Sequence, residues 1–100
     1  MSLIVAGHFS IAPENLVGLR PAMEAMITTT REEDGCEVFN FAEDVLEPGA
    51  IRVFEIWRDR AALDVHAKTP HMAQWIAARA KFGVLERVLF AYESPSRQQL

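Results

Sequence analysis

Apolar residues are grouped along this chain in two patterns. Four short segments, residues 3–11, 36–43, 50–58 and 84–93, are dense in aliphatic, β-branched and aromatic residues, the composition that favours strands. Elsewhere apolar residues recur at spacings of three and four, which is the period of a helix with one buried side. The patterns predict four strands, with helices after the first and third.

The first helical stretch begins at Pro13, a residue suited to the first position of a helix. Pro21 lies inside the stretch and removes one helical hydrogen bond, so we expect a kink or a break near residues 17–20. Asp34-Gly35 should end the helix, because glycine readily adopts the left-handed cap conformation. The apolar stripe consists of Leu16, Leu19, Met23, Met26, Ile27 and Thr30.

Turn and cap residues divide the second half of the chain. Glu47-Pro48-Gly49 predicts a turn that joins the second and third strands into an antiparallel hairpin. Asp59 is suited to cap a short helix through Ala67, and Thr69-Pro70 begins another helix by the same logic. Gly83 should end that last helix.

This order of elements is the split βαβ arrangement of ferredoxin-like folds. It predicts an α+β fold with one four-stranded antiparallel sheet and helices on one face. The 100 residues fit a single domain, residues 1–100. We expect its core to span about residues 3–93, and the polar tail, residues 94–100, to be frayed.

The predicted sheet is apolar on both faces. In the third strand Val53 and Trp57 point to one face with Glu55 between them, while Phe54 and Ile56 point to the other. A sheet with one solvated face shows polar residues in alternation, and this sheet does not. Since the helices cover only one face, we expect a second copy of the chain to cover the other, forming a homodimer.

Composition and charge narrow the range of partners. Half of the residues are hydrophobic, 24% are charged, and the net charge is −4 with Lys and Arg scattered singly. Such a chain is globular and offers no basic patch for nucleic acid or an anionic membrane. Its apolar runs are too short for a membrane span or a signal peptide. Cys36 is the single cysteine, which excludes an internal disulfide, so we expect a cytoplasmic protein.

Several short motifs follow one another in a recognisable order: Glu33-Asp34-Gly35-Cys36, Phe39, Phe54-Glu55-Ile56-Trp57, Ala62-Leu63 with His66, and Pro70-His71. Over roughly residues 4–93 this order resembles the antibiotic biosynthesis monooxygenase family. The resemblance implies a dimeric α/β barrel, in which two four-stranded sheets pack face to face. It also implies an oxygenase that acts on phenols, anthrones or quinols with O₂ and without a cofactor.

The sequence departs from the family's pattern at a few positions. Phe39 stands where the family often has tyrosine, and it offers no hydroxyl group. The haem-degrading branch of the family carries asparagine at the position of Gly7, tryptophan at His66 and histidine at Ile76. Because isoleucine cannot ligate iron, the resemblance argues against haem degradation.

Two residues are candidates for catalysis. His66 is a candidate general base or substrate anchor, because the pKa of imidazole lies near neutral pH. The alternative for His66 is a histidine that only stabilises a helix C-terminus. Glu55 lies on an apolar sheet face, where burial is costly unless the carboxylate is paired. It either orients a group in the site or forms a salt bridge with Arg52 or Arg58 of a second subunit.

Five further residues are candidates for substrate binding: Trp57, His71, His8, Phe39 and Tyr92. Trp57 would form an aromatic wall of a pocket, and plain core packing is the alternative. For His8 the alternative is a core histidine with satisfied hydrogen bonds, and for His71 it is an exposed polar residue.

We expect neither a metal nor a cofactor. His66 and His71 are five residues apart across a proline, unlike the i, i+4 spacing of helical metal ligands, and no carboxylate motif completes a site. The chain also has no flavin, nicotinamide or phosphate-binding motif. A cofactor-free oxygenase is the first hypothesis. A non-enzymatic ligand-binding or stress-related dimer, and an autoinducer-processing isomerase of the same fold, are the alternatives, and oxygen consumption would distinguish them.

Overall fold

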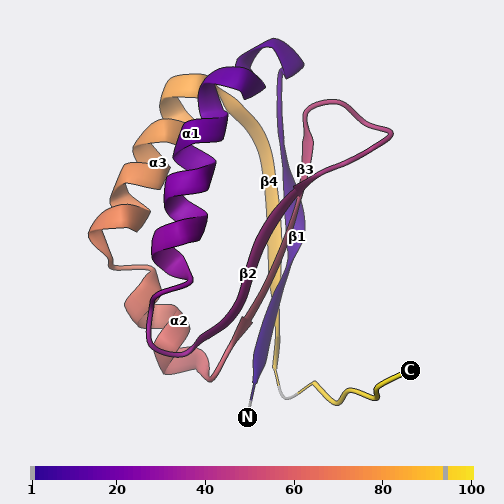
Figure 1. Ribbon diagram of the computed structural model, residues 1–100, viewed down its shortest axis with the longest axis vertical. Helices are drawn as coiled ribbons and strands as arrows, with labels where there is room; N and C mark the ends of the chain where they lie inside the picture. The colour runs from indigo at the N-terminus through magenta and orange to yellow at the C-terminus, as the bar shows by residue number, and fades with distance from the viewer. Residues whose placement is uncertain (1, 94) are drawn as a thin grey trace.

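The fold was derived from a computed structural model that describes residues 2–93 and 95–100. Figure 1 shows the elements along the chain. In order they are β1 (Leu3–Ile11), α1 (Pro13–Thr30), β2 (Cys36–Glu43), β3 (Ala50–Trp57), α2 (Arg60–His66), α3 (Pro70–Phe82) and β4 (Val84–Glu93).

The four strands form one antiparallel sheet in the order β2-β3-β1-β4. Helices α1 and α3 lie side by side against one face of this sheet, and α2 lies below them at one end (Figure 1). This is the α+β, ferredoxin-like arrangement that the order of elements predicts. Sequence patterning was sufficient for it because each strand and helix carries its own periodicity.

The predicted element boundaries in the second half of the chain are confirmed within one residue. Asp59 caps α2, its side chain accepting a hydrogen bond from the Ala62 N–H at 2.8 Å. Thr69 caps α3 in the same way, with the Met72 N–H as donor. Gly83 ends α3 in the left-handed conformation, φ 77°.

The predicted break in the first helix is wrong, because α1 runs without interruption from Pro13 to Thr30. Pro21 removes one backbone hydrogen bond, but buried residues before and after it, Leu19 and Met23, anchor the helix to the core. The helix also ends before Asp34-Gly35. Gly35 does adopt a positive φ, 86°, but in the turn that leads into β2.

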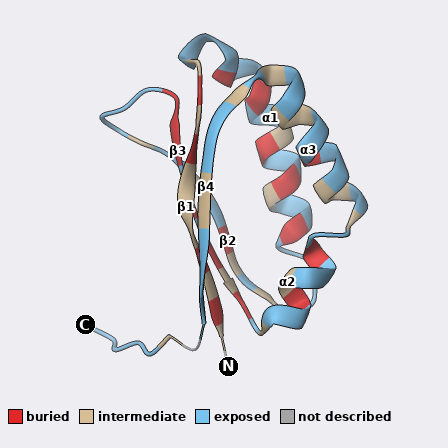
Figure 2. Cartoon of the chain, turned by 180° about the vertical axis from the view of Figure 1, so that it is seen from behind, coloured by how far each residue is buried: buried red, intermediate tan, exposed pale blue. Residues whose placement is uncertain are grey.

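The hydrophobic core fills the space between the helices and one sheet face. Figure 2 shows the buried residues on the sides of helix and sheet that face each other. Alternate residues of each strand point inward, which follows from the two-residue period of a strand. The core consists of Leu3, Val5, Phe9, Ile11, Leu16, Leu19, Met23, Met26, Phe39, Ile51, Val53, Trp57, Ala62 and Trp75.

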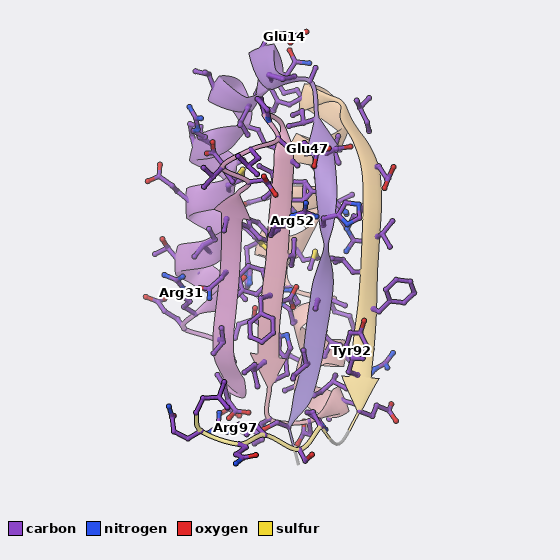
Figure 3. All side chains as sticks on the ribbon, turned by 90° about the vertical axis from the view of Figure 1, so that its right-hand side faces the viewer. Glu14, Arg31, Glu47, Arg52, Tyr92 and Arg97 are labelled. Carbon is purple, nitrogen blue, oxygen red and sulfur yellow. The ribbon has the colours of Figure 1, made fainter. Side chains whose placement is uncertain are left out.

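Among residues 2–93 and 95–100, no helix lies over the other sheet face. Figure 3 looks onto this face, with Arg52 and Tyr92 labelled on it. Apolar residues occupy much of it, including Phe54, Phe90 and Tyr92, which are 41%, 59% and 53% exposed. The interpretation of a two-faced apolar sheet is therefore confirmed for the single chain.

The ends of the chain add little to the fold. Of the predicted frayed tail, Ser94 lies outside the described residues, and residues 95–100 contain no helix or strand. Among the described residues, no helix combines the length and the apolar character needed to cross a membrane.

Gly7 allows the close approach of β1 and β4, and its replacement provides a test of this packing. A Cβ at residue 7 would overlap the carbonyl oxygen of Val88 and lie 2.9 Å from the Cα of Leu89. Backbone atoms cannot rotate away, so we expect Gly7→Ala to lower the free energy of unfolding by at least about 2 kcal/mol in urea titrations. Glu24→Gln, at an exposed position of α1, should change it by less than about 0.5 kcal/mol. Equal effects of the two changes would contradict the close approach.

Candidate functional site

Aromatic and polar side chains meet where β2 and β3 pass beneath α2. Phe39 and Glu55 are direct cross-strand partners, and Trp57 follows Glu55 on the same face of β3. His66, the last residue of α2, lies over them, with its ring centroid 4.7 Å from that of Trp57 and 5.6 Å from that of Phe39. The structure thus brings together four of the residues that the sequence singled out.

His66 is almost completely buried, with 3% of its surface exposed. Its Nδ1 lies 2.6 Å from Oε2 of Glu33, and its Nε2 has no hydrogen-bond partner among the described residues. Its backbone carbonyl accepts hydrogen bonds from the N–H and the hydroxyl of Thr69. Glu33 therefore holds the ring of His66 in place, and Thr69 holds its backbone carbonyl.

Glu33 belongs to the turn between α1 and β2 and is largely buried. Successive backbone hydrogen bonds, Glu33 N–H to Thr30 and Cys36 N–H to Glu33, fold residues 30–36 into tight turns. A Cβ on Gly35 would lie only 2.6 Å from Cβ of Ala62, so only glycine lets this turn approach α2 so closely. That approach places the Glu33 carboxylate beside His66.

His71 joins the same carboxylate from the first turn of α3. Its Nε2 lies 2.8 Å from Oε2 of Glu33 and 3.3 Å from the Thr69 hydroxyl. The ring is partly buried, so the alternative of an exposed polar residue is wrong for His71. Glu33, His66 and His71 come from three segments of the chain, and their contacts span 33 and 38 residues of sequence.

The shared carboxylate fixes which ring nitrogens carry protons. A carboxylate oxygen accepts hydrogen bonds, so His66 donates through Nδ1 and His71 through Nε2. In the neutral form of His66 the remaining nitrogen, Nε2, then carries a free lone pair. Burial lowers the pKa of His66, and the hydrogen bond to Glu33 opposes that effect without reversing it. Burial thus favours the neutral imidazole, whose free lone pair lies at Nε2.

Glu55 is 5% exposed and is paired within its own chain. Its Oε1 accepts a hydrogen bond of 2.8 Å from the indole N–H of Trp57, while Oε2 has no hydrogen-bond partner among the described residues. The arginines considered as intersubunit partners are engaged elsewhere, Arg52 with Asp44 and Arg58 with Asp34. Burial raises the pKa of Glu55, and the Trp57 hydrogen bond and the charge of Arg87 partly counteract this.

A small cavity of about 20 Å³ lies between these residues and the helices. Besides Phe39, Glu55 and His66, its walls include Phe9, Met26, Phe41, Val53, Met72, Trp75, Arg87 and Leu89. A groove of about 130 Å³ lies between α1 and α3 and is lined in part by Ala22, Ala25 and His71. Met26 and Trp75 line both spaces and so form the wall between them.

Two predicted site residues lie elsewhere. His8 points to the uncovered sheet face, where its Nε2 lies 2.9 Å from Glu86, so it is neither a pocket residue nor a core histidine, the two interpretations that the sequence suggested. Side chains alternate along β1, and the neighbours Gly7 and Phe9 take the inward positions. Tyr92 lies on the same uncovered face. Neither residue lines the cavity around His66.

The expectation that no carboxylate completes a metal-ligand set is wrong. The ligand atoms of Glu33, His66 and His71 lie within 4.8 Å of one another, a set of two imidazoles and one carboxylate. Glu33 lies 33 residues before His66, and no local spacing in the sequence connects the two. In the structure the carboxylate already satisfies both rings through hydrogen bonds, which a bound cation would have to replace.

The comparisons with known proteins agree with the fold. The family profile described as "Antibiotic biosynthesis monooxygenase" matches residues 2–78. The Mycobacterium tuberculosis protein named "Putative monooxygenase Rv0793" is 38% identical over 81 residues, 81% of this chain and 76% of that protein. "Uncharacterized protein sll1783" of Synechocystis sp. is 34% identical over 74 residues, 74% of this chain. This chain spans about half, 50%, of the Synechocystis protein's length.

Solved structures share the whole domain. A crystal structure described as a "putative antibiotic biosynthesis monooxygenase" from Deinococcus radiodurans has a TM-score of 0.89 at 27% identity, covering 100% of this chain and 98% of that one. The structure of Rv0793 from Mycobacterium tuberculosis has a TM-score of 0.76 at 33% identity and covers 98% of both chains. These structures therefore confirm the ferredoxin-like fold that the order of elements predicts.

The raised pKa of Glu55 can be tested through the pH dependence of protein stability. The folded chain holds the carboxyl proton to a higher pH than the unfolded chain does, so stability is lost as pH rises through the folded-state pKa. Glu55→Gln keeps an acceptor for Trp57 and does not titrate. We expect its melting temperature to equal that of the wild type at pH 5 and to exceed it by a few degrees at pH 8. A shift of about 4 °C corresponds to roughly 1 kcal/mol of stability.

The control for this comparison is Glu24→Gln, which removes an exposed carboxylate of α1 and should show no such pH dependence. A constant difference between Glu55→Gln and wild type at both pH values would contradict the raised pKa.

Proposed function

Because the chain belongs to the antibiotic biosynthesis monooxygenase family, we propose that it oxidises a small phenol, anthrone or quinol with O₂ and without a cofactor. The observation that carries this proposal is the buried His66, whose Nδ1 is held by Glu33 while Nε2 remains free beside an apolar cavity. Oxygenation without a cofactor requires a base that converts the substrate into an electron-rich anion, and His66 has the properties of such a base.

The reaction can be balanced for an anthrone, whose reacting carbon bears two hydrogens. His66 Nε2 removes one proton and leaves a carbanion-enolate that donates electrons to O₂. A bond forms between that carbon and one oxygen atom, giving a peroxide that takes up the proton. Loss of water then breaks the O–O bond and leaves a carbonyl group, so one oxygen atom enters the product and the other leaves as water.

Glu33 supports this step as a positioning residue. Its carboxylate fixes the tautomer of His66 and stabilises the imidazolium that forms when Nε2 takes the proton. His71 shares the same oxygen and lines the outer groove, so it connects the buried network to the side from which substrate arrives. Phe39 and Trp57 provide aromatic walls, and Glu55 orients Trp57 through the indole hydrogen bond.

Substrate entry requires movement of Met26. The inner cavity alone holds about one water-sized molecule, whereas a cavity of about 150 Å³ holds a benzene ring. The inner cavity and the groove between α1 and α3 together reach that size, enough for a single-ring phenol or quinol, if the side chain of Met26 turns away. Methionine is suited to this because it is unbranched and flexible.

We propose a homodimer in which the uncovered sheet faces pack together. The apolar side chains on that face, with Phe90 and Tyr92 more than half exposed, support the proposal. A domain of 100 residues buries a modest share of its surface alone and gains stability from such an interface.

We also assign the protein to the cytoplasm. Cys36 is the only cysteine and is partly buried. Burial, together with the nearby carboxylates of Glu33 and Glu55, raises its pKa to about 11. Such a thiol stays protonated and makes a poor nucleophile.

The proposed chemistry predicts a difference between two neighbouring glutamates. With a panel of anthrones and hydroquinones, O₂ uptake should be measurable and insensitive to chelators. Glu33→Gln should lower kcat by about 10- to 100-fold, because His66 loses its orientation, and His66→Ala should lower it by at least tenfold. Glu32→Gln, an exposed neighbour, should leave kcat unchanged.

The pH profile supplies a second readout for the same base. Since burial lowers the pKa of His66, kcat/KM of the wild type should fall on the acid side only below about pH 6.5. An active substrate whose turnover is unaffected by His66→Ala would rule His66 out as the base. Saturable ligand binding without O₂ uptake across the panel would favour a binding protein.

The dimer is tested by light scattering at micromolar concentration. We expect about twice the chain mass of 11.2 kDa, and a shift toward the monomer for Phe90→Asp, which places a charge in the proposed interface. Arg60→Asp changes charge on α2, away from that face, and should leave the mass unchanged. A wild-type chain that is folded, soluble and monomeric would contradict the face-to-face arrangement.

A further inference from the structure

A second groove, of about 210 Å³, lies between α3 and β4. It adjoins the inner cavity around His66. Helix α3 contributes Ile76, Arg79 and Ala80, and β4 contributes Leu85 and Arg87 among others. Arg87 also lines the inner cavity, so this residue separates the groove from the space around His66. Two arginines therefore share one groove.

Arg79 has an unsatisfied hydrogen-bond donor. Its Nε is shielded from solvent and has no hydrogen-bond partner among the described residues. A buried N–H without an acceptor is costly, more so when it belongs to a charged group. The position therefore calls for an acceptor that the described part of the chain does not supply.

The charges around Arg79 also favour a negatively charged acceptor. Burial, together with the positive charge of the nearby Arg87, lowers the pKa of Arg79. Neither arginine forms an ion pair within the described residues. Glu86 also lines the groove, but its carboxylate is bonded to His8 on the opposite face of the sheet. On the cavity side the carboxyl group of Glu55 lies close enough to feel the charge of Arg87, but the two form no ion pair. Two like charges thus face one groove with no ion pair to neutralise them.

Apolar side chains flank these cations. Ile76 and Leu85 line the same groove and are 49% and 76% exposed. A purely inorganic anion would leave this apolar surface in water, whereas a carboxylate attached to a ring or short chain would cover it.

We propose that the groove between α3 and β4 binds a small organic acid, with its carboxylate on Arg79 and Arg87 and its apolar body against Ile76 and Leu85. An arginine fork matches the two oxygens of a carboxylate, and charge-assisted hydrogen bonds of this kind are the stronger ones in proteins. The site is separate from the His66 cavity and does not depend on the oxygenase proposal.

The test is calorimetric titration of the full chain at low ionic strength with sodium benzoate as probe. We expect one benzoate per chain, with benzamide, its uncharged analogue, at least tenfold weaker. Arg79→Gln and Arg87→Gln should each weaken benzoate at least tenfold. Lys81→Gln removes an exposed charge from the same helix and should change affinity less than twofold.

Further variants and probes distinguish this site from the His66 cavity and from simple anion binding. Arg87 is exposed, so Arg87→Gln leaves the core intact and remains informative if Arg79→Gln fails to fold. His66→Ala should bind benzoate as the wild type does, which separates this site from the catalytic proposal. Inorganic phosphate that binds as tightly as benzoate would overturn the role of the apolar body. Absence of benzoate binding, or unchanged affinity in both arginine variants, would overturn the site itself.

Discussion

One carboxylate oxygen, Oε2 of Glu33, holds together the three segments on which the site depends. The turn after α1, the end of α2 and the start of α3 meet at this atom through two short hydrogen bonds. Without it, two imidazoles would be left in a partly buried space with no common acceptor, which is costly at low dielectric. The same bonds orient His66, so packing of the helices and chemistry of the site rest on one interaction.

Burial also sets the electrostatic character of the cavity. It lowers the pKa of His66 and raises that of Glu55, and both effects favour the neutral form of the group. The imidazole of His66 and the carboxyl group of Glu55 therefore both favour their uncharged forms, and Arg87 brings a positive charge to the edge of the cavity. A proton that moves to His66 creates a second positive charge there, which the carboxylate of Glu33 stabilises.

The sequence predicted the fold well because its signals are local. Strand runs, the helical stripe, and the caps at Asp59, Thr69 and Gly83 each act within a few residues. Most of the site could not be predicted in this way, since Glu33 reaches His66 across 33 residues and only the tertiary fold aligns them. The orientation of His8 could have been predicted, because strict alternation with the apolar Phe9 places it on the other face.

The position of Met26 would expose an oxygenase of this kind to oxidative damage by its own intermediate. Its thioether forms part of the wall of the cavity in which a peroxide would form, and thioethers are oxidised to sulfoxides by such species. The hydroxyl of Thr30 donates a hydrogen bond to this sulfur at 3.6 Å and occupies one of its lone pairs. A sulfoxide there would turn a flexible apolar wall into a polar one, so in such an oxygenase the number of turnovers before self-inactivation would depend on how well Thr30 protects Met26.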